Sequence, residues 1–141
     1  MQMNFKNARI KILLGFYVLI LAFIIYLADN KGTAYLLNFV RNVPYGDKIG
    51  HFLLMGGLSF LLNLALNAKT VKFWKFGYLL GSLIVLVVVT IEEFSQIFIR
   101  GRTFDLTDLA ADFLGIFLFG ELARFICKRK SKSKEDFAEP Q

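Results

Sequence analysis

Carboxylate and histidine side chains recur at helical spacing in three separate stretches of this sequence. Asp47 and His51 are four residues apart, residues 92–96 contain two glutamates and a glutamine, and residues 105–112 contain three aspartates at steps of three and four. Residues three or four apart lie on the same face of a helix. Groups of this kind transfer protons as general acids and bases, or hold a divalent cation through oxygen and nitrogen ligands. The spacing therefore predicts a polar site built from several helices.

Within these stretches we assign provisional roles. The residues expected to act in catalysis are His51, Glu93 and Asp112. The residues expected to bind a ligand are Asp47, Lys48, Glu92, Gln96, Arg102, Asp105 and Asp108. If the site holds a divalent cation, the candidate metal ligands are His51, Glu93, Asp108 and Asp112. His51 or Glu93 is the candidate general base, oriented by Asp47 or Gln96, and the guanidinium of Arg102 is suited to clamp a phosphate.

Each position also has a purely structural interpretation. Asp105 is well placed to cap a helix, with Asp108 in the first turn, where acidic residues are favoured. Asp47 and Lys48 together are an ordinary polar helix start. These interpretations account for single residues, but they do not explain why the deeper polar residues of all three stretches occur together. We therefore favour a site over a set of caps.

Four apolar blocks are available to carry the polar residues, and they cover 12–28, 49–66, 76–99 and 108–127. Each is close to the roughly 20 residues that a transmembrane helix needs. The 141-residue chain is 56% hydrophobic and 20% charged, which is more apolar than a soluble domain of this size can bury. We therefore predict an all-α fold, a polytopic membrane protein with a four-transmembrane-helix bundle. Residues 1–130 form the transmembrane domain, and 131–141 form a disordered cytoplasmic tail.

The basic residues predict how this bundle is oriented. Twelve of the seventeen Lys and Arg residues precede the first block, separate the second from the third, or lie near the end of the fourth block and after it, where Arg124 is included. Because cytoplasmic loops carry an excess of Lys and Arg, both termini should be cytoplasmic. The polar starts of blocks two and four and the polar end of block three then meet at the outer membrane face. Basic residues placed as topology signals give no reason to expect nucleic-acid binding. The first block lacks a following cleavage site, so we expect it to remain as a helix rather than act as a signal peptide.

Three motifs resemble those of the VanZ-like family. Residues 47–52 read D-K-I-G-H-F and resemble its D-K-x-x-H-F opening, and residues 92–96 read E-E-F-S-Q and resemble its acidic-E-x-x-Q step. Residues 101–108 read G-R-T-F-D-L-T-D and, with Asp112 and Gly115, are similar to its G-R-x-x-D-x-x-D-x-x-x-[N/D]-x-x-G run. The match covers residues 47–120. It departs from the family at Arg100, where proline is common, and at Met55, where an aromatic residue is frequent.

The resemblance implies a small protein of the bacterial cytoplasmic membrane. The name-giving member is associated with resistance to the glycopeptide antibiotic teicoplanin, while the biochemical activity of the family is not settled. Three functions therefore stay open. The first is an enzyme acting on a lipid-linked or cell-envelope substrate, and the second is a non-catalytic protein that binds a glycopeptide, an envelope lipid or a partner. A transporter is disfavoured, because the acids gather at one end and leave the inner half of the helices apolar.

Overall fold

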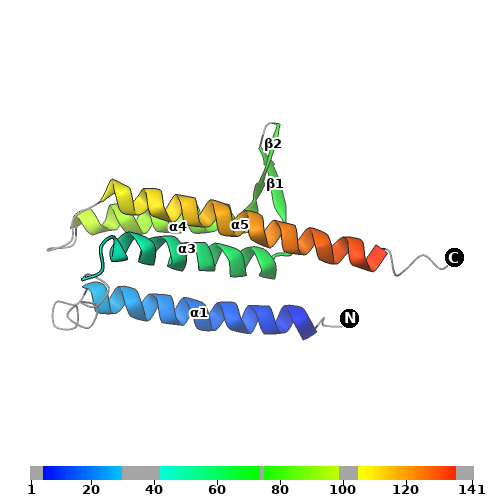
Figure 1. Cartoon of the computed structure of the whole chain (residues 1–141), viewed down its shortest axis with the longest axis horizontal. Coiled ribbons are helices and arrows are strands. Elements are labelled where there is room, and N and C mark those ends of the chain that lie inside the picture. The colour runs from blue at the N-terminus through cyan, green and yellow to red at the C-terminus, as the bar shows by residue number, and fades with distance from the viewer. Residues whose placement is uncertain (1–4, 30–41, 74, 99–104, 136–141) are drawn as a thin grey trace.

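The computed structural model describes residues 5–29, 42–73, 75–98 and 105–135. In chain order the elements are α1 (Phe5–Asp29), α3 (Gly46–Ala65), β1 (Thr70–Phe73), β2 (Phe76–Leu79), α4 (Leu80–Ser95), the 3-10 helix η2 (Gln96–Phe98) and α5 (Leu106–Glu135). The four long helices lie side by side along one axis, and the two strands project from them as a hairpin (Figure 1). The fold is therefore mostly helical, as the apolar blocks predict.

Three of the helices are long and apolar enough to cross a membrane, within the part of the chain that the structure describes. They cover Ala8–Ala28, Gly46–Ala65 and Leu80–Phe98. The fourth predicted span, 108–127, lies inside α5. It differs from the other three because it contains four charged residues, Asp108, Asp112, Glu121 and Arg124. The hydropathy of the chain thus supports three spans directly and leaves the role of α5 to be argued from its packing.

The prediction of an all-α fold is wrong between residues 70 and 79. This segment forms an antiparallel hairpin in which Thr70 pairs with Leu79 and Phe73 with Phe76. Its β-branched and aromatic residues favour strands, and only two residues separate β1 from β2. The third helix consequently begins at Leu80, four residues after the predicted start of the third span at residue 76.

The end of α5 also differs from the prediction. The helix continues through the basic run to Glu135, so the first five residues of the predicted disordered tail, 131–135, are helical. Residues 136–141 of the predicted tail lie outside the described ranges.

Close packing of α3 against α5 forms the centre of the bundle. A Cβ added at Gly115 of α5 would collide with the backbone carbonyl of Phe52 on α3, and one added at Gly56 would lie 2.7 Å from the ring of Phe119. Small residues of this kind let two helix backbones approach each other in a membrane. Helix α4 closes the core with Val85 and Val89, both almost fully buried.

Helix α1 lies along α3, on the side away from α5 (Figure 1). Tyr17 connects the two helices, because its hydroxyl donates a hydrogen bond of 2.9 Å to the backbone carbonyl of Leu54. Much of the remaining surface of α1 is exposed and apolar, for example at Phe16 and Phe23. Such a surface is compatible with lipid as its solvent.

A neutral polar cluster lies inside the bundle, formed by Ser59 and Asn63 of α3 and Ser82 of α4. The Ser59 hydroxyl donates to the backbone carbonyl of Ile116 on α5 at 3.0 Å. The Asn63 amide nitrogen donates to the Ser82 hydroxyl at 2.9 Å and to the Ser59 carbonyl at 2.9 Å. This serine–asparagine cluster joins α3, α4 and α5 below the predicted site.

Candidate functional site

The start of α3 brings its polar residues to one end of the bundle. Tyr45 adopts a left-handed conformation with φ 58°, and the Gly46 amide donates to the carbonyl of Val43 at 2.9 Å. Because of this turn, α3 begins at Gly46, immediately before Asp47, Lys48 and His51. All three therefore lie in the first two turns of the helix.

The end of α4 contributes its polar residues at the same end of the bundle. Glu92 and Glu93 occupy the last turn, and the chain then tightens into the 3-10 helix that begins at Gln96. The side-chain amide of Gln96 donates to Glu92 Oε1 at 3.0 Å and to Glu93 Oε1 at 3.3 Å. Gln96 thus holds two neighbouring carboxylates in place, as predicted for an orienting residue.

Asp105 caps the start of α5. Its Oδ1 accepts hydrogen bonds from the Thr107 hydroxyl at 2.7 Å and from the Thr107 backbone amide at 2.8 Å. These two hydrogen bonds, with a smaller contribution from Lys48, lower the pKa of the Asp105 carboxyl to about 2. The structural interpretation of Asp105 as a helix cap therefore fits the geometry.

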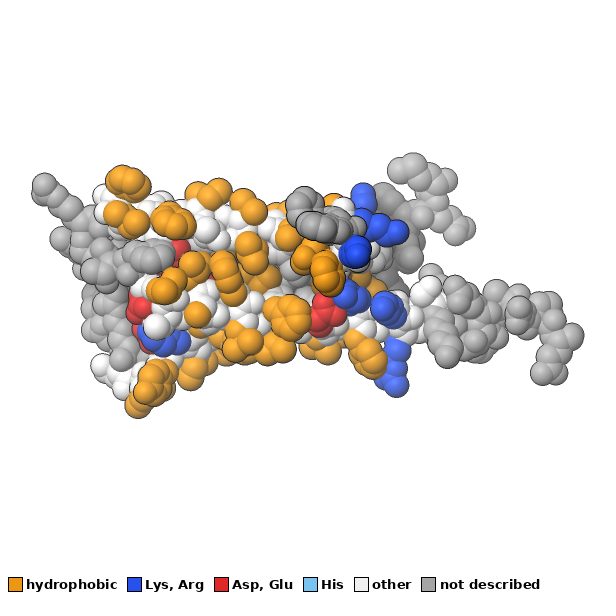
Figure 2. All heavy atoms as spheres, turned by 90° about the horizontal axis from the view of Figure 1, so that it is seen from above, with side chains coloured by type: hydrophobic (Ala, Val, Ile, Leu, Met, Phe, Trp, Pro, Cys, Tyr) orange, Lys and Arg blue, Asp and Glu red, His pale blue; other side chains and the backbone are white. Residues whose placement is uncertain are grey.

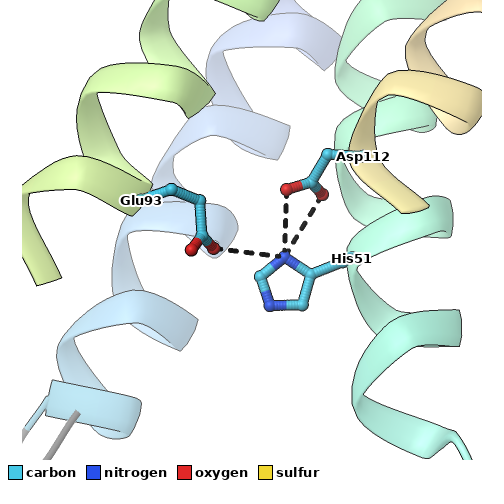
Figure 3. Close-up of side chains that lie close together, drawn as sticks. All are labelled: His51, Glu93 and Asp112. Carbon is cyan, nitrogen blue, oxygen red and sulfur yellow. Dashed lines mark hydrogen bonds and ion pairs between the residues drawn. The ribbon is translucent and has the colours of Figure 1, made fainter. Parts of the chain in front are cut away.

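His51, Glu93 and Asp112 meet between α3, α4 and α5, and we call them the histidine–carboxylate cluster (Figure 3). Nδ1 of His51 lies 3.2 Å from both carboxylate oxygens of Asp112 and 4.0 Å from Glu93 Oε1. The side chains of Asp112 and Glu93 are 0% and 1% exposed. Two buried carboxylates and a half-buried histidine, from three separate stretches of sequence, thus lie against one another.

The aspartates of α5 enter the bundle progressively. The exposed fraction of the side chain falls from 43% at Asp105 to 17% at Asp108 and 0% at Asp112. Asp108 Oδ2 lies 4.0 Å from His51 Nε2, on the other side of the ring from Asp112. The three aspartates therefore form a row that runs from the exposed end of the helix to the buried histidine–carboxylate cluster.

Lys48 crosses between α3 and α5 above the cluster. Its ammonium lies 2.9 Å from Asp108 Oδ1, 3.1 Å from Asp47 Oδ2 and 3.3 Å from Asp105 Oδ2. One cation thus faces three carboxylates, which reduces the repulsion among them. Among the described residues, the cation that faces these acids is therefore a lysine, Lys48.

One oxygen of the histidine–carboxylate cluster is left over. Glu93 Oε2 is buried and has no hydrogen-bond partner among the residues that the structure describes. A buried carboxylate oxygen without a partner is costly, because the interior does not replace the water that it loses. The site therefore has unused capacity for a proton, a cation or a ligand group.

The donor set fits a divalent cation. One ligand atom from each of His51, Glu93 and Asp112 can be chosen so that all three lie within 4.8 Å of one another. Two ligands of one cation, each about 2.0–2.6 Å from it, lie at most about 5 Å apart. The unpartnered oxygen of Glu93 supports this fit, since carboxylates and imidazole are common ligands of divalent metals.

The structure brings most of the predicted site residues together at one end. His51, Glu93 and Asp112 form its buried part, Asp108 and Lys48 lie next to it, and Glu92 is joined through Gln96. Asp47 does not orient His51, as one prediction had it, because its carboxylate contacts Lys48 while Asp112 contacts the imidazole. Asp47 and His51 share a helix face, but α5 packs closer to the ring. Arg102 lies outside the described residues.

Sequence reasoning missed two features that support the site. Lys48 was interpreted as a ligand-binding residue or a polar helix start, and its bridge to α5 depends on tertiary packing. The serine–asparagine cluster was not predicted, although Asn63 interrupts an apolar block and was the available signal. A buried amide on a membrane helix usually has a partner on a neighbouring helix.

Comparisons of the chain with protein-family models, with curated proteins and with solved structures gave no match. A functional assignment therefore depends on the residues of the site and on the motifs that contain them.

Proposed function

We propose that this chain is a bacterial cytoplasmic-membrane protein that crosses the bilayer four times, with α5 as the fourth span and both termini in the cytoplasm. The packing of α5 supports this topology. Its Asp112 is buried against His51, and Glu121 and Arg124 form an ion pair of 3.2 Å within the helix. Its outward surface is apolar, for example at Phe117 and Phe125. Charged residues on a membrane helix are expected to face the bundle or one another in this way.

The proposed function is to act on or bind a cell-envelope ligand at the outer membrane face, either a lipid-linked precursor or a glycopeptide. The observation that carries the proposal is the burial of Glu93 and Asp112 beside His51, with Glu93 Oε2 unpartnered. Folding does not require such a cluster, since apolar residues of similar volume are often as stable. The VanZ-like motifs contain all three residues and suggest teicoplanin resistance as the biological setting.

Proton transfer is one chemistry that the cluster supports. In this chemistry His51 would carry its proton on Nδ1 and donate a hydrogen bond to Asp112, which leaves Nε2 as the base, as in the carboxylate–histidine pairs of hydrolases. Nε2 lies toward Asp108, on the path that leads out along α5. A hydroxyl or bound water of the ligand at Nε2 would give up its proton there.

Coordination of a divalent cation is the other chemistry. His51, Glu93 and Asp112 would hold the ion, and a bound cation would supply Lewis-acid polarisation of a phosphate or carbonyl oxygen. Gln96 donates to Glu93 Oε1, the oxygen that faces His51 (Figure 3), while Glu93 Oε2 has no hydrogen-bond partner among the described residues. Lys48 lies 2.9–3.3 Å from three aspartates at the end of the bundle, and its positive charge offsets theirs.

Antibiotic susceptibility tests the function. The full chain is produced in a teicoplanin-sensitive bacterium, and the minimal inhibitory concentration of teicoplanin is measured. We expect the wild-type chain to raise this concentration at least fourfold, and Glu93→Gln and Asp112→Asn to abolish the increase at equal membrane abundance. The matched control is Glu121→Gln, which removes a carboxylate from the middle of the same helix, away from the cluster that contains Asp112. Unchanged protection in both site variants, or no protection by the wild type, would contradict the proposal.

A binding measurement then separates the two chemistries. Mn²⁺ is titrated into the purified chain in detergent and followed by electron paramagnetic resonance. Saturable binding that Glu93→Gln weakens at least about tenfold, the usual effect of an altered metal environment, supports the cation site. Absence of Mn²⁺ binding together with retained protection supports proton transfer by His51.

A non-catalytic binding protein is the second candidate. The observation that favours it is the lattice of Lys48 with three aspartates, which presents fixed charges at the mouth of the site. In that case Lys48→Gln should weaken protection as strongly as Glu93→Gln does. For an acid–base or metal-assisted reaction, the loss at Glu93 should be much the larger.

A further inference from the structure

A polar cavity lies at the opposite end of the bundle from the histidine–carboxylate cluster. It has a volume of about 420 Å³ and is lined by the hairpin, by the turn that leads into it and by α5. Its polar lining consists of Asn67, Thr70, Arg124, Lys128 and Ser131. Along α3, His51 and Asn67 are separated by about 24 Å at 1.5 Å per residue. This cavity, which we call the basic cavity, is therefore separate from the site described above.

The turn after α3 and the hairpin form the walls of the cavity. Asn67 and Ala68 both have φ 52°, a left-handed conformation that directs the chain away from the helix axis. The Ala68 amide donates to the Asn63 carbonyl at 2.7 Å, and the Leu80 amide donates to the Lys69 carbonyl at 2.9 Å. These bonds fix both ends of the hairpin against the helices. The hairpin consequently stands beside α5 (Figure 1).

The other wall is one face of α5. Arg124, Cys127, Lys128 and Ser131 follow the steps i, i+3, i+4 and i+7, and all four line the cavity. Two cations and a hydroxyl therefore point to the same space. The opposite wall adds the hydroxyl of Thr70 and the amide of Asn67.

Arg124 retains hydrogen-bonding capacity toward this space. Its Nη1 pairs with Glu121 at 3.2 Å, and its Nη2 makes a long contact of 3.4 Å to the Gly77 carbonyl. Its Nε is buried and lacks a hydrogen-bond partner in the described part of the chain. A guanidinium has five N–H donors in a planar fork that matches phosphate oxygens. Arg124 is thus held at the cavity, and not all of its N–H donors are used within the described part of the chain.

The charge around the cavity is strongly positive. Residues 66–79 contain three lysines and no acid, and residues 121–131 contain four basic residues and only Glu121 as an acid. Lys and Arg side chains gather at this end of the molecule (Figure 2). The surroundings therefore favour an anion.

The position of the cavity suggests which anion binds. The exposed apolar surface of α5 extends to Phe125, and the basic run begins at Lys128. Phe76 and Tyr78 of the hairpin are also exposed, and aromatic side chains beside lysines are typical of a membrane–water interface. A phosphate at this level of the bundle would be attached to a lipid whose chains lie along the apolar surface.

We propose that the basic cavity binds the phosphate group of an anionic phospholipid in the leaflet on the hairpin side of the bundle. Arg124 and Lys128 contact the phosphate, and the hydroxyls of Thr70 and Ser131 donate the remaining hydrogen bonds to its oxygens. Cavity binding of this kind does not depend on what the histidine–carboxylate cluster does. It would fix the height of the bundle in the bilayer and secure the hairpin against α5.

Lipid-selective quenching of tryptophan fluorescence tests the proposal. The sole tryptophan, Trp74, lies between β1 and β2 in the sequence. The full chain is reconstituted into phosphatidylcholine vesicles that contain a rising fraction of brominated phosphatidylglycerol or brominated phosphatidylcholine. We expect half-maximal quenching at a phosphatidylglycerol fraction at least about fivefold below that of phosphatidylcholine, the factor supplied by about 1 kcal/mol for one basic residue near a membrane surface.

A matched pair of variants separates the cavity from general surface attraction. Lys128→Gln and Lys130→Gln remove the same charge from one turn of α5, but only Lys128 lines the cavity. Lys128→Gln should abolish most of the preference for phosphatidylglycerol, while Lys130→Gln should keep it. Equal effects of the two variants would overturn the proposal. Arg124→Lys keeps the charge without the planar fork and should weaken the preference at least twofold.

Competition identifies the source of the phosphate. Inorganic phosphate at 10 mM is compared with chloride at the same ionic strength. Persistence of the phosphatidylglycerol preference supports a lipid headgroup, because the acyl chains add binding energy that the free ion lacks. Complete displacement would overturn the lipid assignment in favour of free phosphate. Loss of the preference in Lys128→Gln with intact teicoplanin protection would show that the two ends act independently.

Discussion

Two polar clusters occur between the same three helices, and they differ in how completely their hydrogen bonds are formed. In the serine–asparagine cluster, the Asn63 amide nitrogen has three acceptors at 2.9–3.3 Å and Ser59 reaches the backbone of α5. In the histidine–carboxylate cluster, the imidazole of His51 lies 3.2 Å from Asp112 but 4.0 Å from Glu93. Each cluster leaves one oxygen unpartnered within the described residues, Asn63 Oδ1 and Glu93 Oε2.

The difference lies in charge. An unpartnered neutral amide oxygen has a modest cost, whereas an unpartnered ionised carboxylate in the same interior is far more expensive. The neutral cluster joins three helices through short hydrogen bonds and so contributes to stability. In the charged cluster the cost of removing the charges from water offsets most of the gain from their attraction, so the cluster contributes little stability. A functional role is therefore the better explanation. The two clusters together show that polarity inside this bundle serves two purposes.

The largest effect is expected when the charged cluster is removed as a unit. In the triple variant His51→Leu, Glu93→Met and Asp112→Leu, teicoplanin protection should disappear completely. The free energy of unfolding should stay unchanged or rise by about 1–4 kcal/mol, because buried ionic groups are often replaced by apolar ones without loss. Unfolding is followed by titration of detergent-solubilised protein with sodium dodecyl sulfate. A triple variant clearly less stable than wild type would make the cluster structural.

The next prediction concerns the stability of the bundle, at the contact between α3 and α5. Gly115→Ala places a Cβ against the Phe52 backbone carbonyl, which cannot move without moving α3. Overpacking of this kind should lower the free energy of unfolding by about 3 kcal/mol. Both clusters should be disturbed, since Gly115 follows Asp112 by one turn. Gly50→Ala is the matched control, because a Cβ there meets open space. If both variants are equally stable, the close approach is not what holds the helices.

The next largest loss of unfolding free energy is expected in the serine–asparagine cluster. Ser59→Ala removes the hydrogen bond to Ile116 and one acceptor of Asn63, and should cost about 1–2 kcal/mol of unfolding free energy. Teicoplanin protection should persist at temperatures where the variant remains folded. The control is Ser95→Ala, which removes an exposed hydroxyl that bonds only the local backbone carbonyl of Glu92. Lost protection in stable Ser59→Ala would remove the functional distinction between the clusters.

The smallest effect concerns the cap of α5 and its dependence on pH. The pKa of the Asp105 carboxyl is lowered to about 2 from an ordinary value of 3.8. A lowered pKa means that the cap is fully present above pH 4 and is lost as the pH falls from 4 through 2. The protection factors of the Thr107 and Asp108 amides, which are the intrinsic exchange rate at each pH divided by the observed rate, should fall over that interval. Asp105→Asn should keep the cap without this pH dependence, and an identical profile in both proteins would rule out Asp105 as its source.

The sequence predicted the site more fully than it predicted the elements around it. Helical spacing placed His51, Glu93 and Asp112 at one end, because a periodicity of three to four residues is a local property. The hairpin was missed, since its aromatic residues also suit a membrane helix. The spacing left Asp47 or Gln96 open as the residue that orients the base, and tertiary packing decided that Asp112 contacts His51 and Gln96 contacts Glu93.

By itself the sequence determined that this is a strongly apolar helical chain whose titratable residues meet at one end of its helices. Hydrophobicity and helical periodicity are sums over neighbours in the chain, so they can be evaluated without a fold. Only the tertiary structure decided which of these residues are buried, that Lys48 bridges α3 to α5, and that a basic cavity forms beside the hairpin. Those properties depend on how closely two backbones approach at Gly115 and on how the chain turns after α3, and both are set by packing between residues far apart in sequence.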